Sequence, residues 1–208
     1  MTDEISTGSS FGTFETQDKI LVALSGGVDS SACIRILRDQ GFDVQAVVFR
    51  FSPAHETAVK AAGAVAQQMN VPLTVEDCTG HFEREVVDPF CARHCSGRTA
   101  NSCALHGPHA VFAGLVHTAD RLGIHFIATG HYARIVEESG IYSVRAALSA
   151  ECDQSNLLDG LSQEILARLC LPVGEFEKED IRAIAAEAGL LHAAGNAGPS
   201  HGDAIPEA

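Results

Sequence analysis

A short run of small and acidic residues is the strongest chemical signal in the sequence. Residues 25–30 read Ser-Gly-Gly-Val-Asp-Ser, directly after an apolar stretch and directly before a helical pattern. Consecutive glycines let the backbone turn tightly and bring bare N–H groups close to an anion. The N-terminus of a helix adds partial positive charge at the same place. The run therefore predicts a phosphate-binding loop.

The side chains of this loop have separate expected roles. Ser25, Ser30 and Ser31 offer hydroxyl donors to a phosphate. Asp29 is a poor direct ligand because a carboxylate repels a phosphate, so we interpret it as a helix N-cap or as a carboxylate near Mg²⁺. The loop lacks the Lys of a Walker A motif. An ordinary strand-to-helix turn is the alternative interpretation.

A second group of reactive residues lies between 79 and 107. Cys91, Cys95, Cys103 and His106 follow the spacing C-x3-C-x7-C-x2-H. Three thiolates and an imidazole could bind zinc, and three thiolates alone could hold a [4Fe–4S] cluster with one open iron. We therefore take the three cysteines as candidate metal ligands. The C-x2-C pairs of reliable zinc sites are missing, so separate thiols around a loop are the alternative.

Apolar runs alternate with helical patterns along the chain. The predicted strands cover residues 19–24, 44–51, 73–75 and 124–129, with 141–147 as a fifth strand or part of a hairpin. The predicted helices cover about 30–41, 55–69, 108–123, 154–170 and 178–188. This alternation predicts an α/β fold with a doubly wound, mostly parallel sheet and helices on both faces. Ligands bind such sheets at the carboxyl ends of strands, where Gly27 and Gly130 should lie near each other.

Composition divides the chain and excludes several classes of protein. We expect a flexible leader at 1–17, a nucleotide-binding domain at 18–150, a helical extension at 151–192 and a disordered tail at 193–208. No apolar run reaches the roughly 18 residues of a membrane helix, and the acidic start is not a secretory signal. We therefore expect a cytoplasmic chain without a membrane partner, whose 7 cysteines are thiols or ligands rather than disulfides.

The motifs resemble one known group of enzymes. The loop at 25–30 is similar to the pyrophosphate loop of ATP pyrophosphatases, which activate a carbonyl oxygen by adenylation. Residues 97–103 resemble the Gly-Arg-Thr-Pro-Asn-Pro-Cys segment of tRNA-specific 2-thiouridylases, and 128–134 resemble that family's signature after the fourth strand. Shorter matches follow in the same order at 153–155, 171–174 and 181–190. The resemblance covers roughly 19–192 and implies an adenine nucleotide alpha hydrolase-like fold.

The resemblance also implies a reaction and its participants. The chain would be an ATP-dependent sulfurtransferase that adenylates the C2 oxygen of a tRNA uridine, with ATP and Mg²⁺ as cofactors and a sulfur-donor protein as partner. Phe49 falls where the family places a Met whose backbone meets the adenine, and core packing is its alternative role. Gly130 is either a nucleotide contact or a tight turn. The implied nucleotide-binding residues are Ala23, Leu24, Ser25, Gly26, Gly27, Val28, Asp29, Ser30, Phe49 and Gly130.

The sulfur chemistry is where the chain departs from the family. His106 occupies the position of the family's nucleophilic Cys, and no cysteine follows Cys170, where the persulfide-carrying Cys would lie. Imidazole cannot carry a terminal sulfur, so Cys103 is our candidate catalytic residue for the sulfur chemistry. Asp29 of the loop is the second candidate catalytic residue. Cys152 stands where the family has a Lys, which removes a cation. Cys33, Cys78 and Cys170 sit in apolar patterns and are expected in the core.

Other functions stay open at this stage. One is a nonenzymatic ATP-binding paralogue that has lost the sulfur relay. Another is an ATP-pyrophosphatase sulfur transferase that uses a metal cluster and a different acceptor. The formal net charge of −13 argues against a nonspecific nucleic-acid coat. Because the family's RNA-holding barrel is also not seen in the sequence, we expect weak tRNA binding by this chain.

Overall fold

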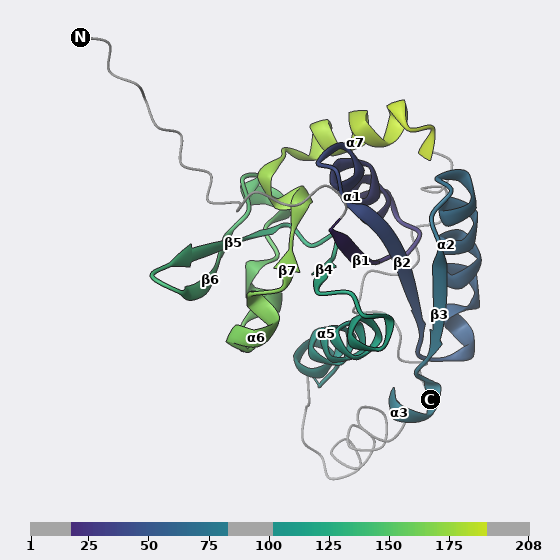
Figure 1. The fold of residues 1–208 in the computed structure, drawn as a ribbon, viewed down its shortest axis with the longest axis horizontal. Coiled ribbons are helices and arrows are strands. Elements are labelled where there is room, and N and C mark those ends of the chain that lie inside the picture. Colours follow the sequence, from purple (N-terminus) through teal and green to yellow (C-terminus); the bar gives the residue numbers. More distant parts are fainter. Residues whose placement is uncertain (1–17, 83–101, 191–208) are drawn as a thin grey trace.

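A parallel sheet forms the centre of the structure, a computed structural model that describes residues 18–82 and 102–190 (Figure 1). The sheet has 5 strands in the order β3-β2-β1-β4-β7. All of its strand pairs are parallel, as the alternating sequence pattern predicts. The strands are β1 (Lys19–Ala23), β2 (Asp43–Arg50), β3 (Leu73–Asp77), β4 (Phe126–Ala128) and β7 (Leu169–Cys170).

The central strand β1 is apolar because both of its faces are covered. Ile20, Leu21 and Val22 are fully buried. A strand between two layers of helices reads as a continuous apolar run, since successive side chains point to opposite faces. Ile20 pairs with Val44 of β2 on one side and with Phe126 of β4 on the other. The carboxyl ends of β1 and β4 therefore lie at the same edge of the sheet.

Helices cover both faces of the sheet, as predicted (Figure 1). One core lies under α1, α2 and α7 and includes Ile20 and Leu37. The other lies under α5 and α6 and includes Leu21 and Phe112. The helices are α1 (Val28–Asp39), α2 (Glu56–Gln68), α3 (Thr79–Phe82), α5 (Ser102–Leu122), α6 (Gln163–Leu166) and α7 (Lys178–Glu187).

An antiparallel hairpin stands beside the sheet (Figure 1). It consists of β5 (Ala133–Glu138) and β6 (Ile141–Ala146), so residues 141–147 belong to a hairpin rather than to the main sheet. Ser139 and Gly140 at its turn have φ of 55° and 80°. Such a pair of left-handed residues matches the twist of hairpin strands. The short 3-10 turns are η1 (Pro53–His55), η3 (Ala150–Cys152), η4 (Ser155–Leu158) and η5 (Pro172–Glu175).

Two helix predictions are wrong. The helix expected to open at Pro108 begins at Ser102 instead. A proline beyond the first turn of a helix removes one backbone hydrogen bond and crowds the carbonyl four residues before it, which is why the sequence pattern favoured a helix start at Pro108. Residues 154–170 form η4, α6 and β7 rather than one helix. Gly160 has a φ of 83°, a left-handed conformation that ends a helical run.

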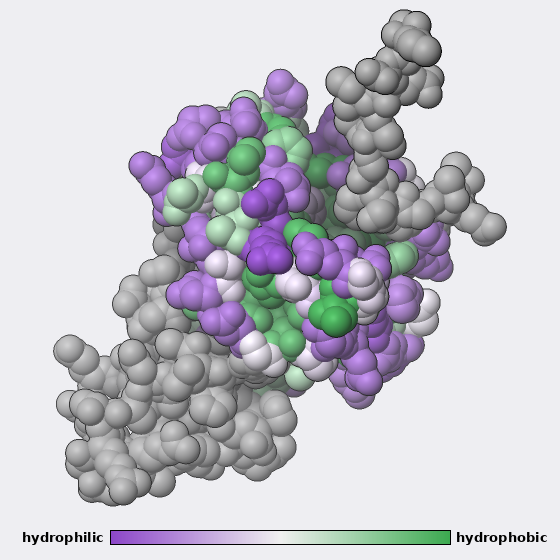
Figure 2. Space-filling model, turned by 90° about the vertical axis from the view of Figure 1, so that its left-hand side faces the viewer, coloured by the Kyte–Doolittle hydropathy of each residue, from purple (hydrophilic) through white to green (hydrophobic). Residues whose placement is uncertain are grey.

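The surface of the hairpin side is mixed in polarity. Figure 2 shows apolar and polar side chains interspersed on that face. Ile141 and Leu148 are large apolar residues that are more than half exposed. In the ranges 18–82 and 102–190, no helix is both long and apolar enough to cross a membrane.

The predicted division of the chain stays a prediction. The leader 1–17 and the tail 193–208 lie outside the described residues. The segment after residue 150 supplies β7 to the sheet and α7 to one of its faces.

A substitution at Gly174 in η5 tests how tightly the segment after residue 150 packs on the hairpin. A Cβ at Gly174 would lie 1.8 Å from the carbonyl oxygen of Ala133 and 2.6 Å from its carbonyl carbon. Backbone atoms cannot move aside alone, so we expect Gly174→Ala to lower the free energy of unfolding by about 2 kcal/mol or more. Urea denaturation measures the change.

Gly63 in α2 is the matched control. A Cβ there meets no described atom within 4 Å. Gly63→Ala should therefore raise stability by about 0.5–1 kcal/mol, because alanine favours the helix. Equal urea midpoints for Gly174→Ala and the unaltered chain would contradict the packing described here.

Candidate functional site

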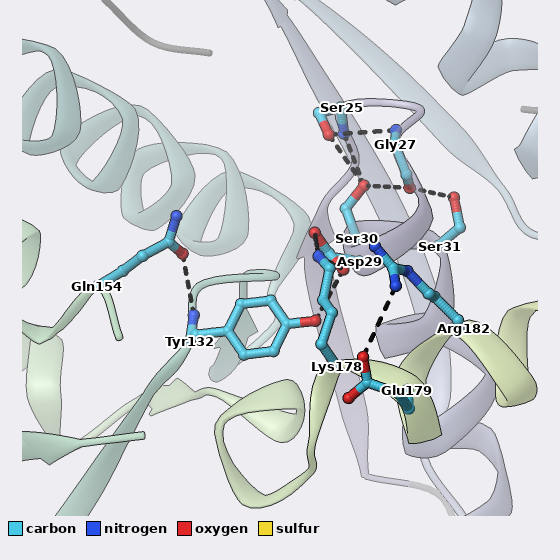
Figure 3. A network of polar contacts seen from close by, with 10 residues as sticks. All are labelled: Ser25, Gly27, Asp29, Ser30, Ser31, Tyr132, Gln154, Lys178, Glu179 and Arg182. Carbon is cyan, nitrogen blue, oxygen red and sulfur yellow. Dashed lines mark hydrogen bonds and ion pairs between the residues drawn. The ribbon is translucent and has the colours of Figure 1, made fainter. Parts of the chain in front are cut away.

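The phosphate loop lies between the end of β1 and the start of α1 (Figure 3). Gly26 has a φ of 81°, in the left-handed region that favours glycine. A Cβ at Gly26 would lie 2.6 Å from the Cβ of Ala61 and 2.8 Å from the backbone nitrogen of Ala62. The loop therefore packs directly against α2, and its shape requires glycine at this position.

Gly27 faces open space instead. It is the N-cap residue of α1, with φ −80° and ψ 165°, a conformation that any residue adopts. Among the described residues, a Cβ at Gly27 would meet one atom within 4 Å, the Oγ of Ser25 at 3.5 Å. The fold itself does not require a glycine here, but a ligand close to the backbone would.

The serine hydroxyls hold the loop in shape. The Oγ of Ser31 donates to the carbonyl oxygen of Gly27 at 2.7 Å, and the Oγ of Ser30 donates to the same oxygen at 3.1 Å. The Oγ of Ser25 lies 3.0 Å from that of Ser30 and accepts from the N–H of Gly27 at 3.3 Å (Figure 3). Two of the three predicted phosphate donors, Ser30 and Ser31, are buried and bonded to the loop's own backbone.

Backbone N–H groups remain as the donors for an anion. Val28, Asp29 and Ser30 form the first turn of α1. The N–H groups in a first turn have no acceptor within their own helix, and the helix dipole adds positive potential there. The geometry therefore suits a phosphate better through amides than through hydroxyls.

Gly130 lies directly against this first turn. A Cβ at Gly130 would lie 2.8 Å from the backbone nitrogen of Ser30 and 3.0 Å from its Cα. The loop and Gly130 thus meet at the carboxyl edge of β1 and β4, as predicted. Glycine is needed at position 130 because its backbone approaches the backbone of Ser30 closely, and not because of a left-handed turn. Its contact with a nucleotide stays a prediction.

Asp29 is not the N-cap, because that position belongs to Gly27 and α1 has no side-chain cap. Its carboxylate instead accepts hydrogen bonds from Lys178 and Tyr132 (Figure 3). The Nζ of Lys178 lies 2.8 and 2.9 Å from the two carboxylate oxygens, and the hydroxyl of Tyr132 donates at 2.9 Å. Burial and then the charge of Asp29 raise the pKa of Tyr132, so the tyrosine stays a neutral donor.

Residues after β4 are tied to the segment around 154. The N–H of Tyr132 donates to Oε1 of Gln154 at 3.0 Å, and the N–H of Gln154 donates to the carbonyl oxygen of Tyr132 at 2.7 Å. Nδ1 of His131 is hydrogen-bonded to Oγ1 of Thr129 at 2.9 Å. These bonds fix the orientation of Tyr132 toward Asp29.

The side chain of Phe49 belongs to the core. It is 8% exposed, stacks on Phe51 with ring centroids 5.9 Å apart, and packs on Gly114 of α5. A Cβ at Gly114 would lie 3.0 Å from Cε1 of Phe49. Core packing is therefore the role of this side chain. A contact of its backbone with the adenine stays a prediction.

Three described cysteines are poorly suited to nucleophilic chemistry. Burial raises the pKa of Cys170 to about 11, and burial followed by the charge of Asp29 raises the pKa of Cys33. Burial also raises the pKa of Cys78. The reactive thiolate is disfavoured at all three positions. Cys33 is buried, as predicted, whereas Cys78 and Cys170 are partly buried residues packed against the two cores.

The predicted metal ligands lie where the structure describes no side chains. Cys91 and Cys95 lie outside the described residues, and the side chain of Cys103, near the start of α5, is not described. In the part of the chain whose side chains are described, no three His, Cys, Asp or Glu residues gather as a metal site.

Lys178 and Tyr132 are the site residues that sequence reasoning missed. Tyr132 lies inside the matched segment 128–134, which was a usable signal. Lys178 opens a predicted helix, but nothing in its spacing connects it with Asp29. Lys178 and Asp29 are 149 positions apart in the chain.

Comparison with known proteins gives relatives that act on tRNA. The chain is 40% identical over 186 residues to tRNA-specific 2-thiouridylase MnmA of Syntrophotalea carbinolica, with 85% of this chain and 52% of that protein covered. It is 35% identical over 184 residues to the same enzyme of Clostridium acetobutylicum, with 83% and 52% covered. The chain spans about half the length of these relatives. These matches confirm the resemblance to 2-thiouridylases.

Solved structures confirm the fold. A 4-thiouridine synthetase in complex with RNA and bound ATP has a TM-score of 0.61 at 19% identity, covering 86% of this chain and 42% of that one. NMN synthetase from Francisella tularensis has a TM-score of 0.54 at 11% identity, covering 89% and 67%. The model of the tRNA methyl transferase HUP domain matches residues 18–198. The chain therefore belongs to the tRNA methyl transferase HUP domain family.

Proposed function

We propose that this chain takes part in ATP-dependent thiolation of a tRNA uridine by binding ATP at the loop 25–30. The observation that carries the proposal is the open backbone of Gly27 beside the first turn of α1, against which Gly130 packs. The names of its relatives, tRNA-specific 2-thiouridylases, support tRNA as the substrate. Because tRNA is handled in the cytoplasm, we expect the chain to act there.

The proposed reaction has two steps. In the first, the C2 oxygen of the uridine attacks the α-phosphate, an O–P bond forms and pyrophosphate leaves. In the second, a sulfide-level sulfur delivered by the donor attacks C2, a C–S bond forms as the C2–O bond breaks, and AMP leaves with the oxygen. The loop amides and the dipole of α1 bind and stabilise the phosphate charge in both steps.

Mg²⁺ would neutralise phosphate charge beside the loop. Asp29 is the carboxylate in the loop that could join it. Both of its carboxylate oxygens accept hydrogen bonds from the Nζ of Lys178, so the metal would have to displace that ammonium.

Sulfur delivery is assigned to the segment that carries Cys103. Cys103 is the candidate sulfur carrier, with Cys91 and Cys95 as its partners in a [4Fe–4S] or zinc site. The raised pKa values of Cys33 and Cys170 support this choice, because they disfavour the thiolate at those positions. A sulfur-donor protein would supply the sulfur atom.

Gly27→Val tests the nucleotide site. The backbone of Gly27 tolerates valine, but the added side chain would keep phosphate away from the amides of α1. We expect at least tenfold weaker ATP–Mg²⁺ binding by calorimetry, with little change in thermal midpoint. Release of pyrophosphate in the presence of tRNA should fall in parallel.

Gly63→Ala is the control, since a Cβ there meets no described atom within 4 Å and Gly63 lies in the middle of α2, outside the loop. It should leave ATP affinity unchanged. Full ATP affinity in Gly27→Val would refute the loop assignment. ATP binding by the unaltered chain without tRNA-dependent pyrophosphate release would instead identify a nonenzymatic paralogue.

Iodoacetamide labelling at pH 8 tests the assignment of the cysteines. Because burial raises the pKa of Cys170 to about 11, its reactive thiolate is disfavoured at this pH. We expect Cys170 and Cys33 to stay unlabelled in the native chain and to react after denaturation in urea. Once a chelator has removed any metal from the chain, the peptide that contains Cys103 should label without denaturation. Rapid native labelling of Cys33 or Cys170, read by mass spectrometry, would argue against their core role.

A further inference from the structure

We propose that Tyr132 is a positioning residue for Asp29. Its hydroxyl holds one oxygen of the Asp29 carboxylate and leaves the other oxygen for the Mg²⁺ that accompanies the nucleotide. This inference rests on the proposed function, because it assumes that the loop 25–30 binds ATP with Mg²⁺. It gives a role to a buried side chain that follows β4 and acts on the metal through Asp29.

The first observation is how the partners of Asp29 are divided between its two oxygens. The hydroxyl of Tyr132 donates to Oδ1 at 2.9 Å (Figure 3). The Nζ of Lys178 lies 2.8 Å from Oδ1 and 2.9 Å from Oδ2. Among the described residues, Lys178 is therefore the one hydrogen-bond donor to Oδ2, whereas Oδ1 has two donors. If a metal displaces the ammonium, Tyr132 still holds Oδ1, and Oδ2 is the oxygen that the metal can take.

The second observation is that Tyr132 is itself held in place. Its residue is 2% exposed, and its backbone exchanges two hydrogen bonds with Gln154, at 3.0 and 2.7 Å. The side chain of Asp29 is 32% exposed, and the last torsion of an aspartate has broad energy wells. A carboxylate of this kind needs a fixed partner to keep one orientation. Tyr132 is fixed through its backbone and reaches Asp29 with its hydroxyl, so it can set that orientation.

The third observation concerns charge. Burial and then the charge of Asp29 raise the pKa of Tyr132, so its hydroxyl keeps its proton and donates it as a neutral group. A neutral donor orients the carboxylate without neutralising it, whereas an ammonium does both. Mg²⁺ prefers negatively charged oxygen ligands. Tyr132 therefore leaves the negative charge of Asp29 available to a metal.

A tie between the segment after β4 and the first turn of α1 is the competing explanation for this hydrogen bond. If the bond were a tie alone, removing the hydroxyl would lower the thermal midpoint. It would then change the affinity for ATP to the same extent with and without Mg²⁺. The dependence of nucleotide affinity on Mg²⁺ therefore separates the two explanations.

Calorimetric titration of the chain with a non-hydrolysable ATP analogue, once with Mg²⁺ and once with a chelator, is the test. Tyr132→Phe should bind the Mg²⁺-loaded analogue at least fivefold more weakly than the unaltered chain, because Asp29 is no longer held for the metal. Its affinity for the metal-free analogue should stay within twofold. Asp29→Asn should lose at least as much of the Mg²⁺ effect. Adding Tyr132→Phe to Asp29→Asn should reduce it no further, because the tyrosine acts through the carboxylate.

Tyr142→Phe is the matched control. Tyr142 lies on β6 of the hairpin, where its backbone N–H and carbonyl oxygen pair with the side chain of Gln163. This variant removes the same hydroxyl group away from the loop, and both affinities should change by less than twofold. Circular dichroism on each variant checks that it is folded.

Gln154→Met keeps the test decisive if Tyr132→Phe does not fold. It leaves the hydroxyl of Tyr132 in place and removes the oxygen that accepts from its backbone N–H. The tyrosine is then held less firmly, so the Mg²⁺ effect should fall at least twofold while the metal-free affinity stays unchanged.

Two results in Tyr132→Phe would overturn the inference. One is an unchanged Mg²⁺ effect, and the other is equal weakening with and without Mg²⁺, which would identify a structural tie. If the unaltered chain does not bind the analogue at all, the proposed function fails as well. If it binds the analogue but shows no Mg²⁺ effect, or if Asp29→Asn keeps the full effect, the loop assignment stands and the role of Tyr132 fails.

Discussion

The close approach of two backbones at one edge of the sheet sets the geometry of the site. Gly130 leaves β4 so near to the first turn of α1 that a Cβ would lie 2.8 Å from the nitrogen of Ser30. Parallel pairing of β1 with β4 brings the two segments to this edge. Gly26 has the same role on the other side, where the loop touches α2. Glycine at both positions lets the loop stay between its neighbours.

Charge in the loop is balanced by parts of the chain that are distant in sequence. Asp29 lies in the first turn of α1, Tyr132 follows β4, and Lys178 opens α7. Three hydrogen bonds meet on one carboxylate, two from Lys178 and one from Tyr132. The folding of the late segment onto α1 therefore completes the charge distribution of the loop.

Local patterns in the sequence predicted much of the fold and the loop of the site, but not Tyr132 or Lys178. The apolar run at 19–24 and the glycines at 26 and 27 identify β1 and the loop, because their pattern depends on neighbours in sequence. Long-range packing explains what was missed. Leu169 and Cys170 form β7 by pairing with β4, although their apolar pattern also suits a helix. The partnership of Lys178 with Asp29 likewise exists through the docking of α7 on α1.

A crystal structure with a non-hydrolysable ATP analogue and Mg²⁺ tests the central claim most directly. The account predicts phosphate oxygens within hydrogen-bond distance of the backbone N–H groups of Val28 to Ser30. An analogue bound away from the loop 25–30, or a triphosphate that makes no contact with these amides, would contradict it.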